Sequence, residues 1–302
     1  MGLWSSIKKA AKKVVSVVKT VVRTVVKVVA ETVSRVINSL AEIFLYWKEK
    51  KVRIVVLILR DEMGFPLIDL NPNTLDPIKV ALRTDLNEAI NNVKTTFKDK
   101  MNIEVRPYGT EIQILKDSAP TAALGVRCDP TARGVGVAAG GAAIGGMLGI
   151  LGGPPGIIIG AALGFGAGAA IAGGRSGGAL SNEFSEAGSY FAKNTAGWGW
   201  LRMNFQFPIT IFIVRDIEGK IGCSLGPLTD YVTIGTTPTT GPNPISGVSS
   251  EYNMAHELGH CCGLLFHSDD MKNLMYPDHG RDNNVKSWQK ALVRTSRHCT
   301  FW

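Results

Sequence analysis

The sequence predicts a mixed α+β fold, and three observations support this class. Apolar runs of strand length recur before and after the middle of the chain, two longer segments show the apolar spacing of a helix, and a third helix is expected to carry a histidine motif. At 302 residues, the chain is long enough for one sizeable domain with accessory segments.

The expected elements follow a simple order. A strand over 52–60 precedes an amphipathic helix over 76–100, where apolar residues recur at helical spacing. The other expected strands cover 103–108, 111–115, 208–216, 220–224 and 230–234. Two further helices are expected at 249–265 and 285–299, so that strands and helices are mixed along the chain.

The segment 256–267, which begins within the expected helix over 249–265, contains three of the five histidines of the chain. His256 and His260 are four residues apart, which places both imidazoles on one face of a helix. At this spacing two nitrogens can reach one Zn²⁺ ion at about 2.0–2.1 Å. Glu257 follows the first histidine and can take a proton from metal-bound water. The motif therefore predicts a zinc site with Glu257 as the general base.

A catalytic zinc needs a third protein ligand. Gly263 can adopt a backbone conformation that ends the helix, and the chain can then turn so that His267 reaches the metal. Asp269 or Asp270 is the alternative third ligand, since carboxylates also bind zinc. With three imidazoles as ligands, zinc lowers the pKa of its water towards about 7 and polarises the scissile carbonyl.

The segment from His267 to Asn273-Leu274-Met275-Tyr276-Pro277 resembles the part of matrixin-type metzincins between the third histidine of HExxHxxGxxH and the Met-turn. The motif residues themselves lie within 256–277, whereas the order of strands and helices resembles that of the family over about 50–118 and 195–302. It implies a zincin domain with a twisted mixed sheet, a zinc helix, a C-terminal helix, and Met275 as a packing floor. Phe266 occupies the position of the third histidine in the family pattern, so we expect a one-residue insertion between Gly263 and His267. The interval from His267 to Met275 still matches the family, and this favours His267 over the two aspartates as the third ligand.

The net positive charge of the chain comes from its first 60 residues. Residues 1–60 contain 13 Lys/Arg and 3 Asp/Glu, whereas the other 242 residues contain 20 and 22. Residues 1–47 are expected to form a basic amphipathic helix, with valines at spacings of three and four, that contacts a lipid membrane. A coiled-coil arm, a mitochondrial-type targeting helix and myristoylation of Gly2 are alternatives. No nucleic-acid partner is expected, because no basic face is combined with aromatic residues.

Residues 134–174 contain 16 glycines and no charged side chain. Glycines recur every fourth residue on both sides of Gly152-Gly153-Pro154-Pro155-Gly156, which predicts a glycine-zipper hairpin. Each arm has about 19 residues, enough for a hydrocarbon core of ~30 Å. The hairpin would be inserted between the two parts of the protease domain, 48–133 and 175–302, and could mediate self-association. A flexible linker is the alternative.

Five cysteines contain no CxxC pair, so a second, structural zinc site is not expected. Cys261 and Cys262 are expected to be small core residues, with a disulfide from one of them to Cys299 as an open possibility. Cys128 is expected to be an ordinary loop cysteine, and no pairing is assigned to Cys223.

These features together predict a zinc-dependent, membrane-associated endopeptidase that cleaves a peptide or protein substrate. Lysines interrupt every apolar run near the start, so the protein would be secreted or delivered without a Sec signal peptide, as a toxin, an effector or a virion-borne enzyme. The alternative is a membrane-penetrating or pore-forming protein whose protease domain serves only processing or release. A scaffold with a vestigial site is a third reading.

Overall fold

The computed structural model describes residues 31, 33–35, 37–42, 44–128, 185–196, 207–227, 229–240 and 244–301. The expected glycine-zipper hairpin over 134–174 and the first 30 residues lie outside these ranges. Within them, no helix combines the length and the apolar character that crossing a membrane requires.

A mixed sheet forms the centre of the described structure, which confirms the α+β class. Its strand order is β2-β1-β4-β7-β6, and a short β8 pairs with β1 outside this path. The strands are β1 (Lys50–Arg60), β2 (Ile103–Ser118), β4 (Ile209–Val214), β6 (Gly222–Ser224), β7 (Tyr231–Gly235) and β8 (Cys299–Thr300). The first four strands of the path are parallel, whereas β6 runs antiparallel to β7 at one edge. A separate pair joins β3 (Gly125–Val126) and β5 (Asp216–Ile217).

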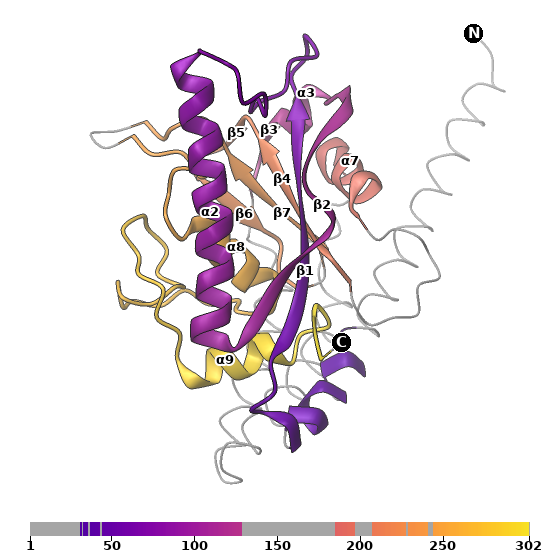
Figure 1. Cartoon of the computed structure of the whole chain (residues 1–302), viewed down its shortest axis with the longest axis vertical. Coiled ribbons are helices and arrows are strands. Elements are labelled where there is room, and N and C mark those ends of the chain that lie inside the picture. The colour runs from indigo at the N-terminus through magenta and orange to yellow at the C-terminus, as the bar shows by residue number, and fades with distance from the viewer. Residues whose placement is uncertain are drawn as a thin grey trace, which may run out of the picture.

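Helices cover both faces of the sheet. On one face lie α2 (Pro77–Met101), α8 (Asn253–Cys261) and α9 (Ser287–Arg294), and on the other lie α3 (Thr121–Leu124) and α7 (Glu186–Asn194) (Figure 1). Strand β1, which lies between β2 and β4, is buried on both sides because its alternate residues enter different cores. Val56 and Ile58 pack with α2 and α8, while Leu57 packs with the α7 side. This two-sided core places α8 beside the edge strand β6.

The longest helix, α2, has clear start and stop signals. The Asp76 carboxylate accepts hydrogen bonds from two backbone N–H groups of the first turn, and Pro77 occupies the first turn. Asn102 ends the helix in the left-handed conformation with φ of 57°. The helix predicted over 76–100 is therefore confirmed almost to the residue.

Other predicted boundaries were wrong. The two strands expected at 103–108 and 111–115 are one strand, β2, whose pairing with β1 is irregular near Ile54 and Val56. The histidine helix begins at Asn253 rather than 249, because Ser246 and Ser249 form local side-chain hydrogen bonds that replace a first helical turn. Helix α7 was not predicted.

The end of the N-terminal arm is helical and packs against the rest of the protein through its polar face. Residues 31, 33–35, 37–42, 44 and 45 are helical, and Glu31, Arg35 and Glu42 are buried. Glu31 pairs with Arg35 at 2.6 Å and with Arg297 at 3.1 Å, and Glu42 pairs with Arg294 at 2.8 Å. These buried ion pairs connect the arm to the end of α9.

Candidate metal centre

Helix α8 presents two imidazoles on one face. The Nε2 atoms of His256 and His260 lie 3.1 Å apart, one helical turn from each other along the helix. The other side of α8 is apolar, and Leu258, Cys261 and Cys262 are buried in the core. This burial confirms the expected core role of the two cysteines and fixes which face of the helix meets the cleft.

A glycine turn brings the third histidine back to the other two. Gly263 has φ of +108°, a conformation that favours glycine, and its N–H bonds the carbonyl of His260 at 2.9 Å. The chain then returns so that Nε2 of His267 lies 3.2 Å from Nε2 of His260. Phe266 is 48% exposed, so the extra residue turns outward and leaves His267 at the site.

The three histidines form a group that can hold a metal ion, because one nitrogen from each lies within 4.8 Å of the others. Among the described residues, no other group of three or more His, Cys, Asp or Glu side chains brings its ligand atoms this close together. Asp269 and Asp270, the alternative ligands, are exposed and do not belong to it. The backbone conformation after Gly263 thus favours the histidine over the aspartates.

Backbone carbonyls orient two of the rings. Nδ1 of His256 lies 2.8 Å from the carbonyl oxygen of Leu274, and Nδ1 of His260 contacts the carbonyl oxygen of Leu264. A carbonyl accepts hydrogen bonds only, so each Nδ1 carries the proton and donates it, which leaves the Nε2 lone pair free. Burial lowers the pKa of His256, and it lowers that of His260 to about 3. Both rings are therefore neutral, as metal binding requires.

Met275 lies against the histidine helix at Gly259. It is fully buried, and a methyl group placed on Gly259 would come within 3.0 Å of its Sδ atom. The turn is fixed because the Asn273 side chain accepts a hydrogen bond from the Met275 N–H at 2.9 Å. Asn273 is in turn held by Gln289 of α9 at 2.9 Å, which ties the turn to the last helix.

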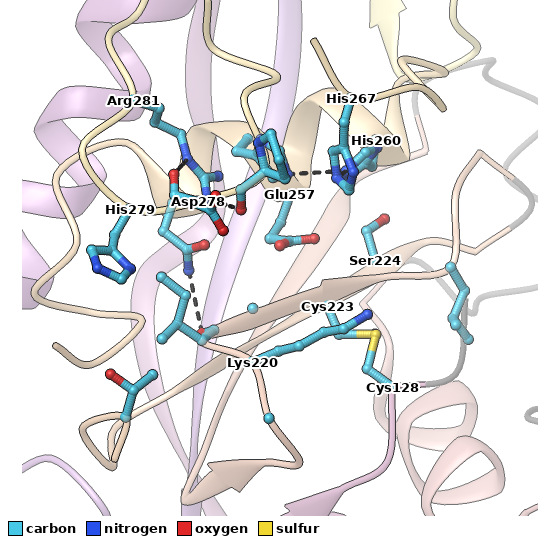
Figure 2. A pocket seen from close by; sticks show the side chains of 18 of the residues that line it. Cys128, Lys220, Cys223, Ser224, Glu257, His260, His267, Asp278, His279 and Arg281 are labelled. Carbon is cyan, nitrogen blue, oxygen red and sulfur yellow. Dashed lines mark hydrogen bonds between the residues drawn. A yellow bond between two sulfur atoms is a disulfide. The ribbon is translucent and has the colours of Figure 1, made fainter. Parts of the chain in front are cut away.

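Glu257 points into the cleft next to the histidines (Figure 2). Burial raises the pKa of its carboxyl from 4.5 to about 7, although nearby Arg281 and Lys220 and a backbone hydrogen bond from Ser224 oppose this shift. Gly222 of β6 faces it so closely that a methyl group there would lie 2.7 Å from Glu257 Oε1. The edge strand therefore requires glycine at this position.

The cleft has a volume of about 570 Å³ and is bounded by β6, α8 and the segment after the Met-turn. Figure 2 shows Arg281, Asp278 and His279 on one side of Glu257, with His260 and His267 on the other. Arg281 was not predicted as a site residue, since no motif marks it. The only indication in the sequence is that Arg281 lies between the Met-turn and the last helix, in a segment that returns to the cleft.

The structure corrects the expectation for Cys128. It forms a disulfide with Cys223 of β6, with the two Cα atoms 5.9 Å apart, and both cysteines border the cleft. Cys261, Cys262 and Cys299 are not disulfide-bonded, so the possible bridge from the histidine helix to Cys299 does not form. The two paired cysteines are 95 residues apart, and only the pairing of β3 with β5 beside β6 brings them together. The disulfide links the edge strand β6 to Cys128. Cys128 is the last described residue before the structure resumes at residue 185.

Comparison of the chain with models of known protein families and with curated proteins gives no match in either case.

Proposed function

We propose that the protein is a zinc-dependent endopeptidase of the metzincin type. The observation that carries the proposal is the convergence of three Nε2 lone pairs beside a buried carboxylate in an open cleft. Ligands about 2.0–2.1 Å from a tetrahedral zinc lie about 3.3 Å from one another, close to the 3.1 and 3.2 Å separations of the histidine nitrogens. The donor set of three neutral imidazoles suits zinc.

The chain order supports the same class. A strand, a long helix, further strands, the histidine helix, a buried methionine turn and a last helix follow one another as the metzincin resemblance implies. The mixed sheet ends in the antiparallel strand β6 above Glu257. Since a sheet edge offers unpaired backbone groups, an extended peptide can pair with β6 and present a bond to the site.

Zinc, when bound, polarises the scissile carbonyl and makes a water molecule acidic enough to be deprotonated near neutral pH. Glu257 accepts the proton of the attacking water and then delivers it to the amine that leaves. Burial of this carboxyl raises its pKa and so favours the protonated form, which lets Glu257 hold the proton until the amine leaves. Burial of the carboxyl also keeps bulk water from competing for this proton.

The test is metal content combined with cleavage of a peptide mixture. We expect one zinc per chain, and cleavage that a chelator abolishes and added zinc restores. His267→Ala should lose at least tenfold in zinc affinity together with activity, whereas Asp270→Ala, the matched control from the same loop, should keep both. Zinc binding without cleavage of any peptide would contradict the enzyme, and loss of zinc in Asp270→Ala would contradict His267 as ligand.

We also propose that the protein docks on a lipid surface, because its arm exposes an apolar stripe. The polar face of this helix is buried, whereas apolar side chains spaced four, three, four and three residues apart along the helix and the turn that follows it are 41–69% exposed. They are Val33, Ile37, Leu40, Phe44 and Trp47. The arrangement is opposite to that of an ordinary surface helix, whose apolar face packs inward. The exposed stripe has no covering element in the described part of the chain.

A membrane surface is the occupant that the charge favours. Residues 1–60 carry a net charge of +10, which attracts anionic lipid headgroups. The stripe ends in aromatic residues, which favour the interface between lipid and water. The valine pattern upstream continues the same spacing in the sequence. Lipid binding would place the catalytic domain at a membrane and so at a membrane-associated substrate.

Vesicle flotation tests this surface. Replacing Phe44 and Trp47 by serine should reduce binding to phosphatidylserine vesicles at least tenfold, because two large apolar side chains leave the lipid. The matched control replaces Met63 and Leu75, which are 81% and 95% exposed elsewhere, and should bind normally. Peptide cleavage in solution should be unchanged in both variants. Unreduced flotation, or a dimer that only the first variant abolishes, would show that lipid is not the occupant.

A further inference from the structure

The cleft contains a cation that the proposed reaction does not use. Arg281 is only 6% exposed and borders the same cleft as Glu257 and the three histidines. Its guanidinium is fixed at two points, since Nε donates to the Asp278 carbonyl and Nη2 to the Pro277 carbonyl, each at 3.0 Å. The third nitrogen, Nη1, is buried and has no hydrogen-bond partner among the described residues.

A buried guanidinium nitrogen without a partner is uncommon, because losing its hydration costs free energy that nothing returns. Arg281 also forms no ion pair within the described chain, although Glu257 and Asp278 are near enough to influence its pKa, which burial lowers. Elsewhere in the fold, the fully buried arginines Arg35, Arg294 and Arg297 all pair with carboxylates. Arg281 therefore differs from its buried counterparts in lacking an acidic partner of its own.

The charge of the cleft points in the same direction. Lys220 and Arg281 line it together with two acids, Glu257 and Asp278. A divalent metal on the three neutral histidines would leave the occupied cleft with a net positive charge. A low-dielectric cleft of one sign concentrates ligands of the opposite sign.

From these observations, and resting on the proposed function, we infer that Arg281 receives a carboxylate of the substrate beside the scissile bond. The substrate class is then an acidic peptide, in which an aspartate, a glutamate or the C-terminal carboxylate lies within a residue or two of the cleaved bond. A carboxylate fits because it accepts hydrogen bonds from the planar guanidinium and neutralises its charge. Arg281 would be a specificity-determining residue.

The experiment compares peptides that differ by one group. A neutral peptide receives either Glu or Gln at each position around the cleaved bond, and a parallel pair ends in a free acid or an amide. For one position, or for the free acid, we expect kcat/KM to rise roughly tenfold to 100-fold over the neutral peptide. The position that responds distinguishes a side-chain carboxylate from a terminal one.

In Arg281→Gln the ratio of acidic to neutral peptide should fall close to one, whatever happens to overall activity. Arg281→Lys, which keeps the charge but not the fork of donors, should retain part of the ratio. Arg106→Gln is the matched control, since Arg106 lies on β2 and is 46% exposed in its side chain. This control should keep the full ratio and the full activity.

A binding measurement keeps the inference separate from the reaction. Fluorescent Glu and Gln peptides are titrated into the zinc-loaded Glu257→Gln protein, and the ratio of their Kd values should depend on Arg281 in the same way. If neutral peptides are cleaved as fast as acidic ones, or the Kd values are equal, the carboxylate inference is overturned while the enzyme stands. If acidic peptides bind preferentially but none is cleaved, the proposed reaction fails and the inferred site stands.

Discussion

Glu257→Gln is expected to reduce kcat/KM for peptide cleavage by about 10²–10⁴-fold, the usual contribution of a general base. Glutamine has the size of glutamate, so it fits against Gly222 but cannot accept the proton of the attacking water. Zinc content should not change, because Glu257 is not one of the three converging histidines. Glu251→Gln, on the turn just before α8, is the matched control and should keep its activity. Unreduced cleavage by Glu257→Gln would rule out the proposed mechanism.

Although Glu257→Gln should reduce activity, it should raise the free energy of unfolding of the metal-free protein above neutral pH. Burial raises the pKa of Glu257 from 4.5 to about 7, so its contribution to stability is complete below pH 4.5 and is lost as the pH rises through 7. Glutamine stays neutral, so the metal-free variant at pH 8 should unfold with a free energy on the order of 3 kcal/mol higher than the metal-free parent. The difference should disappear near pH 4.5. Urea denaturation at the two pH values measures it.

Arg35→Ala is expected to destabilise the fold by about 3–5 kcal/mol, because it breaks a buried ion pair by removing one partner. Arg35 is fully buried, pairs with Glu31, and donates to the Leu292 and Cys262 carbonyls at 3.0 Å each. The Cys262 contact lies where α8 ends, and a methyl group on Gly263 would come within 2.2 Å of the Arg35 side chain. Zinc affinity should therefore fall along with the unfolding midpoint.

The control for this prediction is Arg106→Ala, which removes an exposed pair with Glu104 and should leave the urea midpoint unchanged. If Arg35→Ala were as stable as this control, the arm would not be docked on the catalytic domain. A destabilised variant that still binds zinc normally would show that the arm supports the fold but not the turn at Gly263.

Much of the candidate site could be predicted from sequence because its geometry is local. His256 and His260 meet because a helix repeats about every four residues, and Gly263 allows the turn that returns His267. Met275 follows within a few residues, so the chain can place it under the helix without a long connection. Strand β1 and helix α2 were also predictable, since each has a clear apolar pattern and α2 has a capped start.

The remaining features depend on contacts between distant parts of the chain, which only the tertiary structure decides. Cys128 meets Cys223 because β3 pairs with β5, and Arg281 reaches the cleft because the segment after the Met-turn folds back over Glu257. The amphipathic pattern of the arm predicted a helix but not its orientation. Its polar face turned inward because Arg294 and Arg297 offer buried charges that Glu42 and Glu31 neutralise. The spacing of residues along the sequence therefore determined the histidine motif, because its members lie within a few helical turns of one another. Contacts between residues far apart in the chain depended on how the strands and helices pack in the tertiary structure.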